Sequence, residues 1–214
     1  MTSSYRTNHS FDFLEIITEL EFTQKKYKPL KPLKTGNSIP ALTLSKDYNT
    51  WRQFFNGSQV HGPILHRQLL SKPLVISFHS SKWGESGVAR LKQLNNIQHE
   101  IKAAGANLLI ITPDEESKEF EKLVWDNSLS LSFYFDEHNS IAEKLRIFSD
   151  ASPVWNTYSG IDANVPLLAT YVIDTSNHIL YDDIDHELLG RISAGDILDA
   201  VHASSLYLSN RRSA

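Results

Sequence analysis

The sequence predicts an α/β protein with a mixed central β-sheet that carries helices on both faces. Two apolar runs rich in strand-forming residues, 74–78 and 108–112, flank a segment in which apolar residues recur every three or four positions. This pattern is typical of a strand, a crossover helix and a parallel strand. Two further strand-like runs, 169–173 and 178–181, are joined by the turn-forming sequence Asp-Thr-Ser-Asn and predict an antiparallel hairpin. Parallel strands followed by such a hairpin make a mixed sheet.

The other elements follow in order along the chain. The crossover helix ends at Gly105, and its apolar stripe consists of Val88, Leu91, Leu94, Ile97, Ile101 and Ala104. After Pro113 we expect a second helix, then a strand over 131–135 and a short helix over 141–148. Ser193 followed by Asp196 is typical of a capped helix N-terminus and predicts the last helix.

Three segments are expected along the chain. Residues 1–32 are predicted to be a helical N-terminal extension and linker, residues 33–203 the α/β domain, and residues 204–214 a polar tail. Ser10 can cap the N-terminal helix, because apolar residues follow it at near-helical spacing. The two prolines within 28–32 disfavour helix at the residues before them, and this favours an extended linker.

Composition and charge exclude several classes of function. The 214 residues are 41% hydrophobic, which is enough for a packed core, and 21 basic against 25 acidic residues give a net charge of −4. The chain therefore lacks the basic footprint of a nucleic-acid-binding protein. No stretch approaches the roughly 18 apolar residues of a membrane span, and the polar start lacks the apolar core of a signal peptide, so we expect a cytoplasmic protein without membrane contact.

Zero cysteine is the most restrictive feature, because it excludes disulfides, thiolate metal sites and thiol nucleophiles. The nine histidines are scattered, and the densest ligand-capable run, residues 181–187, lacks the spacing of a calcium loop, so it is interpreted as a solvated acidic loop. We expect no metal and no cofactor. Ser86 near His79 raises a hydrolase alternative, which needs a third group to orient the base, but no G-x-S-x-G turn surrounds the serine.

Five short motifs follow one another at residues 34–44, 73–91, 111–114, 135–139 and 169–174. They begin with K-T-G-N-S-I-P-A-L-T-L and end with I-T-P-D, F-D-E-H-N and A-T-Y-V-I-D, and the second and longest is PLVISFHSSKWGESGVARL. In order and spacing they resemble the motifs of the peroxiredoxin-like (redoxin, AhpC/TSA) family. The resemblance covers about residues 33–201 and implies a thioredoxin-like fold with thiol peroxidase chemistry.

The resemblance also implies where that chemistry would lie. In this family a cysteine at a helix N-terminus, favoured as thiolate by the helix dipole, attacks a peroxide and becomes a sulfenic acid that a second thiol resolves. The family pattern is W-C-P-Y-C, and this chain has Trp83, Gly84, Glu85, Ser86 and Gly87 in its place. Glycine therefore replaces both cysteines.

Further positions of the implied site also differ or allow another use. Leu168 stands where the family commonly has a proline, usually cis, and we expect a trans bond because a non-proline cis bond costs about 2.5–4 kcal/mol. Free N–H groups around Gly84 and Gly87 can hold a small anion, with help from Lys82 and from Arg191, where the family often carries an arginine. The competing interpretation is that the glycines only fill the space of lost cysteines.

Two functional hypotheses follow. The first is a non-catalytic binding or regulatory pseudoenzyme that uses the former active-site cleft, with a small anion or a protein as partner and a homodimer as a further option. The alternative is an antioxidant oxidoreductase of the AhpC/TSA family that acts by a mechanism the sequence does not reveal. Thiol peroxidase chemistry is excluded in both, because Met1 carries the only sulfur.

Overall fold

A seven-stranded sheet forms the centre of the computed structural model, which describes residues 27–61, 69–114 and 117–212. The helix expected after Ser10 lies outside these residues. The strands are β1 (Trp51–Phe55), β2 (Ser58–Val60), β3 (Leu74–Phe78), β4 (Asn107–Thr112), β5 (Ser132–Phe135), β6 (Ala169–Ile173) and β7 (Ile179–Ile184). Their order is β2-β1-β5-β4-β3-β6-β7. β4 pairs parallel with β3 and with β5, and the other neighbours are antiparallel, so the predicted mixed sheet is confirmed.

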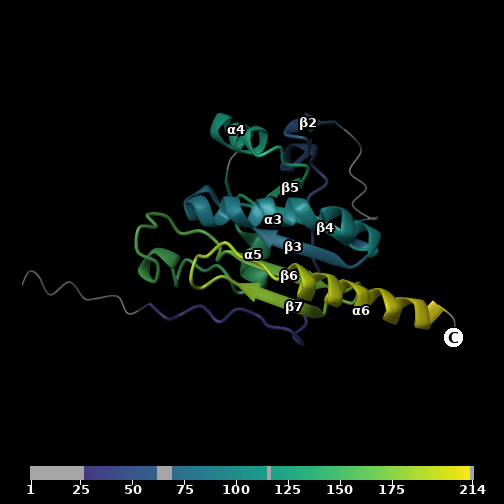
Figure 1. Cartoon of the computed structure of the whole chain (residues 1–214). Coiled ribbons are helices and arrows are strands. Elements are labelled where there is room, and N and C mark those ends of the chain that lie inside the picture. Colours follow the sequence, from purple (N-terminus) through teal and green to yellow (C-terminus); the bar gives the residue numbers. More distant parts are fainter. Residues whose placement is uncertain (1–26, 62–68, 115–116, 213–214) are drawn as a thin grey trace, which may run out of the picture.

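Helices cover both faces of the sheet, as predicted (Figure 1). The helices are α3 (Gly84–Ala103), α4 (Lys118–Asp126), α5 (Ser140–Lys144) and α6 (Ala194–Arg212), and three short 3-10 turns are η1 (Tyr48–Thr50), η2 (Ser81–Trp83) and η3 (Val154–Asn156). Buried side chains of α3, α4 and α6 belong to one core cluster, and those of α5 belong to the cluster on the opposite face. None of the helices within the described ranges is long and apolar enough to span a bilayer.

The two core clusters follow from the alternation of side chains along the central strands. In β3, Val75 points to the face covered by α3, while Ile76 lies in the cluster on the opposite face. β4 repeats the pattern with Ile110 and Ile111. All of these side chains are at most 1% exposed, so β3 and β4 are buried on both faces, as contiguous apolar runs predict.

The hairpin of β1 and β2 was not predicted. Its two-residue turn, Asn56-Gly57, has positive φ angles of 47° and 81°, which is the conformation that Asn-Gly favours in tight hairpins. A Cβ on Gly57 would lie 2.9 Å from the Cα of Trp125, so glycine also allows the turn to approach α4 closely. The strands are short and mix polar with apolar residues, which explains why their periodicity is weak.

Both ends of the described chain refine the predicted boundaries. Residues 27–34 contain no helix or strand, and residues 36–39 run along the start of β7, where Gly36 N–H donates to Ile179 O and Ile179 N–H donates to Asn37 O, both at 2.9 Å. At the other end α6 continues to Arg212, so the boundary predicted between residues 203 and 204 falls inside a helix. Residues 204–212 contain no glycine or proline that would end it.

Candidate functional site

The site lies where the chain leaves β3 and enters α3. After Phe78 the chain forms η2, whose N-terminus is capped by Ser80, because the Ser80 hydroxyl oxygen accepts from Lys82 N–H at 3.2 Å. Asp114, just after β4, fixes the same turn: its carboxylate accepts from Ser80 Oγ at 2.9 Å and from Ser81 N–H at 2.5 Å. The carboxyl ends of two parallel strands thus hold the start of α3 in place.

Trp83 is a packing residue that fastens the loop before β6 to this turn. Its side chain is buried, and its indole N–H donates to Pro166 O at 2.9 Å. Its ring packs edge-on against Tyr158 with ring centroids 5.4 Å apart. Leu168, at the end of the same loop, is 1% exposed, and the expected trans bond before it is confirmed because the described residues contain no cis peptide.

Position 84 favours glycine because of its backbone conformation and not because the surroundings are crowded. Its φ of 52° with ψ of −131° lies in a region that residues with a side chain rarely adopt. A Cβ at Gly84 would meet no atom within 4 Å, and the residue is exposed. A side chain therefore has room at the first cysteine position, but the backbone conformation disfavours it.

Gly87 is the opposite case, because its backbone is helical and its surroundings are full. A Cβ here would lie 3.1 Å from Nδ1 and Cε1 of His79 and 3.2 Å from Cβ of Trp83. His79 is 3% exposed, and burial lowers its pKa to about 4, although the nearby Asp114 raises it. Its imidazole is therefore neutral at neutral pH, and it fills the space beside the second cysteine position.

The hydrolase alternative finds no support in the contacts of Ser86. Its hydroxyl donates to Leu188 O, in the loop after β7, and not to His79. Within the described residues, Nδ1 of His79 has no hydrogen-bond partner. A nucleophilic serine needs a base within hydrogen-bond reach and a group that orients the base, and this pair provides neither.

The four residues predicted to hold an anion occupy different environments. Gly84 is exposed and Gly87 is buried under His79. Lys82 Nζ lies 2.9 Å from Asp162 Oδ1 in an exposed ion pair, and the hydrogen bond from Lys82 lowers the pKa of Asp162. Arg191 is exposed, and its backbone oxygen accepts a hydrogen bond from Nη2 of Arg90.

Arg90, which the sequence analysis missed, is the buried arginine of this site. It is 1% exposed, and its Nη1 lies 2.7 Å from Asp183 Oδ2 and 3.1 Å from Thr170 Oγ1. Its Nη2 lies 3.6 Å from Asp185 Oδ2 and donates to Arg191 O at 3.1 Å. Arg90 therefore connects the second turn of α3 to β6, β7 and the loop that follows β7.

The prediction that residues 181–187 form a solvated acidic loop is therefore wrong. Its first half belongs to β7, and Asp183 and Asp185 face the buried Arg90. The available signal was the place of Arg90 on the apolar side of α3, four residues before Leu94. A cation on a buried stripe needs an acidic partner. Within the described ranges, no group of three or more acidic, histidine or cysteine side chains is placed to hold a metal.

A cleft of about 630 Å³ opens beside the first turns of α3. It is lined by His79, Ser81, Gly84, Glu85, Val88, Ala89, Lys92 and Leu123. The lining combines one acidic and one basic side chain with apolar ones, which is the usual make-up of a small binding site. This cleft adjoins the positions at which the sequence resemblance places the two lost cysteines.

A comparison with models of protein families identifies the family of this chain. The model of the AhpC/TSA family matches residues 36–182, well over half of the chain. The chain belongs to the AhpC/TSA family. The match runs from the edge of β7 through β3 and α3 into β7, so it includes the whole cleft beside α3 and ends before Asp183, Asp185 and Arg191. No curated protein matches the sequence.

Solved structures similar to this AhpC/TSA member confirm the thioredoxin-like fold. Reduced 2-Cys peroxiredoxin from Plasmodium vivax has a TM-score of 0.56 at 16% identity, with 83% of this chain and 85% of that chain covered. AhpC from Mycobacterium tuberculosis has 0.56 at 15%, covering 81% and 93%. AhpC from Mycobacterium bovis has 0.54 at 17%, covering 81% and 93%. At these identities the likeness concerns the fold alone.

Proposed function

We propose that this AhpC/TSA family member is a non-catalytic binding protein that uses the cleft beside α3. The observation that carries the proposal is the state of the two cysteine positions. Gly84 has open space but a backbone conformation suited to glycine, and Gly87 is packed against His79. A family fold without a thiol at either position retains a cleft and loses the nucleophile.

The polar residues in and beside the cleft do not replace the thiol chemistry of the family. Reduction of a peroxide by the family route needs a thiolate that becomes a sulfenic acid. His79 is a weak base because burial lowers its pKa to about 4. The Ser86 hydroxyl is engaged by Leu188 O. The alternative of an antioxidant oxidoreductase with another mechanism predicts peroxide consumption, which binding alone does not.

A small anion is the ligand that we propose for the exposed first turn of α3. The N–H groups of this turn carry the positive end of a 20-residue helix. Lys82 lies next to the turn in an exposed pair with Asp162, and such pairs exchange readily with other anions. Glu85, also exposed, opposes anion binding and favours a weak site. We further propose a cytoplasmic protein, with a second protein or a second copy as the larger partner.

An NMR titration with inorganic phosphate and with sulfate tests this proposal. We expect the amide signals of residues 84–87 to shift with saturation, while amides on the opposite face of the sheet stay in place. Lys82→Ala should weaken the effect, because it removes the adjacent cation. Asp162→Ala should strengthen it, because it frees Lys82. No shift at residues 84–87 with either anion at high concentration would refute the anion as ligand.

A further inference from the structure

A second pocket lies between the N-terminal linker and the loop that precedes β6. Its volume is about 240 Å³, and its lining is contributed by the linker segment 27–32, by the loop segment 152–158, by Leu167 and by His186. Among the described residues, none lines both this pocket and the cleft beside α3. The linker segment and His186 lie outside residues 36–182, so the match to the family model does not account for this pocket.

The linker segment is held against the domain at both of its ends. At its start, Tyr27 packs edge-on against Trp155, with ring centroids 5.3 Å apart. Just after its end, Leu33 N–H donates to Leu145 O at 3.0 Å. The two prolines between these contacts restrict the backbone and favour an extended chain. One wall of the pocket is therefore formed before any ligand binds.

The walls of this pocket are largely apolar. Six apolar side chains from the linker and from the domain line it: Pro29, Leu30, Pro32, Pro153, Val154 and Leu167. The three that belong to the domain are buried, and Leu30 packs against the same core cluster as they do. A proline has no N–H, so this part of the lining offers few hydrogen-bond donors. Such walls favour a ligand with a compact apolar body.

A hydrogen-bonded pair of side chains supplies the polar part of the lining. Tyr158 Oη lies 3.2 Å from Nδ1 of His186. Burial and the nearby Asp185 raise the pKa of Tyr158, so its phenol keeps its proton at neutral pH. Even as a neutral ring, His186 carries one proton, and the pair uses only one of its two protons in this hydrogen bond. Whichever group donates, the other proton, on Nε2 of His186 or on Tyr158 Oη, is left for a ligand that accepts.

The charges of the lining favour an anion. Lys28 contributes a positive charge, and none of the described residues that line the pocket is acidic. Asp185, whose charge acts on Tyr158, lies 3.6 Å from Nη2 of Arg90, and its carboxylate accepts from two backbone N–H groups. The negative charge of Asp185 is therefore largely compensated. A carboxylate in the pocket would meet both a hydrogen-bond donor and a cation.

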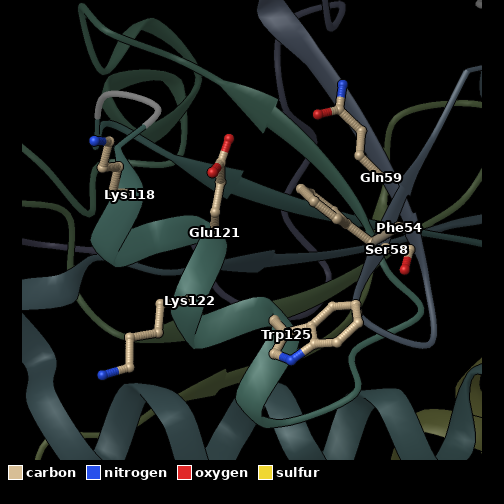
Figure 2. A pocket seen from close by; sticks show the side chains of 8 residues that line it. Phe54, Ser58, Gln59, Lys118, Glu121, Lys122 and Trp125 are labelled. Atoms are coloured by element: carbon tan, nitrogen blue, oxygen red, sulfur yellow. The ribbon is translucent and has the colours of Figure 1, made fainter.

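The larger hollow between β2 and α4 lacks this combination (Figure 2). Its volume is about 580 Å³, and Figure 2 shows the side chains of Lys118 and Lys122 directed away from Phe54, whereas Glu121 and Trp125 stand beside that ring. Both signs of charge line it, and Trp125 is 63% exposed. This hollow is therefore a suitable reference for unspecific binding to exposed aromatic surface.

We propose that the pocket behind the linker segment binds a small carboxylic acid with a compact apolar body, such as a single aromatic ring. The apolar body lies between the linker segment and the buried side chains of the domain. The carboxylate accepts a hydrogen bond from the Tyr158–His186 pair, and Lys28 stabilises its charge. This site is separate from the anion site proposed at α3, so either proposal can fail without the other.

Three compounds with one apolar body and different charge test the proposal by NMR on the full chain. Phenylacetate is the anion, phenylacetamide its neutral analogue and 2-phenylethylamine the cation. We expect phenylacetate to give saturable shifts of the indole N–H signals of Trp155, which packs on Tyr27, and of Trp83, which packs on Tyr158. The indole signal of Trp125 should stay in place. Phenylacetamide should bind about fivefold more weakly or worse, and 2-phenylethylamine should cause no shift.

A double variant tests the hydrogen-bonded pair. Tyr158→Phe combined with His186→Ala removes both donors and keeps the ring that packs against Trp83, so we expect phenylacetate to bind about tenfold more weakly. Tyr48→Phe combined with His99→Ala is the matched control, because both residues are exposed and neither lines the pocket. Unchanged circular dichroism confirms that both variants fold, and the control should bind as the wild type does.

Four outcomes would overturn the proposal. The first is the absence of a saturable shift at Trp155 with phenylacetate, and the second is a shift of Trp125 that follows the same curve, which indicates unspecific binding. The third is equal binding of the three compounds, because it would exclude recognition of the carboxylate. The fourth is wild-type affinity of the variant that lacks both donors.

Discussion

The imidazole of His79 lies against Gly87, so closely that a Cβ on Gly87 would be 3.1 Å from its Nδ1 and Cε1. One residue comes from the end of β3 and the other from the first turns of α3. The contact connects the glycine at which the resemblance places the second cysteine to a side chain eight residues earlier in the chain. A side chain cannot return to position 87 without movement of the imidazole or of Trp83.

This contact predicts coupling between the two positions. Gly87→Ala improves helix propensity but crowds the imidazole, and crowding of a packed core costs typically about 1–3 kcal/mol. In a His79→Ala background the crowding by the imidazole is relieved and only the 3.2 Å approach to Cβ of Trp83 remains, so the same substitution should cost less. Urea unfolding of the four proteins gives the coupling free energy, for which we expect about 1 kcal/mol. Additive effects would show that His79 and Gly87 do not restrain one another.

Gly84 should resist substitution for a different reason. Its φ of 52° with ψ of −131° is strained for any residue with a Cβ, at a cost of about 1–3 kcal/mol. Gly84→Ala and Gly84→Cys should therefore both lower the free energy of unfolding by similar amounts. Gly195→Ala is the control, since Gly195 lies in the first turn of α6, has no positive φ and has open space. Unchanged stability of Gly84→Ala would contradict the backbone argument.

His79 should make folding stability depend on pH. Its pKa in the folded protein, about 4, is below the ordinary value of 6.5, because burial disfavours the imidazolium. Between these values the unfolded chain binds more protons, so stability is full above pH 6.5 and decreases as the pH falls towards 4. His79→Gln should remove this part of the slope. Parallel pH profiles of unfolding for wild type and variant would exclude the assignment.

The buried Arg90 should be essential for the loop after β7. Arg90→Met leaves Asp185 buried without its cation, and removal of one partner from a buried pair costs about 3–5 kcal/mol. We also expect faster hydrogen exchange at the amides of Leu189 and Gly190, which donate to the Asp185 carboxylate. Lys82→Met, which breaks an exposed pair, should leave stability unchanged. Equal effects of the two substitutions would contradict the network.

The sequence predicted the central elements because their signals are local. Residues 74–78 are apolar without interruption, and α3 has a regular stripe that ends at Gly105. The β1–β2 hairpin was missed although Asn56-Gly57 is a strong turn signal, because both strands are short and mix polar with apolar residues. The local pattern of polar and apolar residues does not reveal a strand that is stabilised mainly by hydrogen bonds to neighbouring strands.

The site was predictable in position but not in detail. The two glycines could be located by resemblance, and their different environments could not. Gly87 depends on the orientation of the His79 ring, and Gly84 depends on a backbone angle. Arg90 and Asp183 lie 93 positions apart, so their charges indicate solvent exposure until the fold joins them. An ion pair between residues so far apart in the sequence is determined by the topology of the fold and not by their spacing in the sequence.

The rate of peroxide consumption by the purified wild-type protein tests the central claim most directly. Hydrogen peroxide and an alkyl hydroperoxide should be offered in separate reactions with a thiol reductant and no added metal. We expect the rate of the reductant alone for both peroxides, because the chain contains no group that forms a thiolate. Consumption at an enzymatic rate, lost when the protein is unfolded, would contradict a non-catalytic function and favour the oxidoreductase alternative.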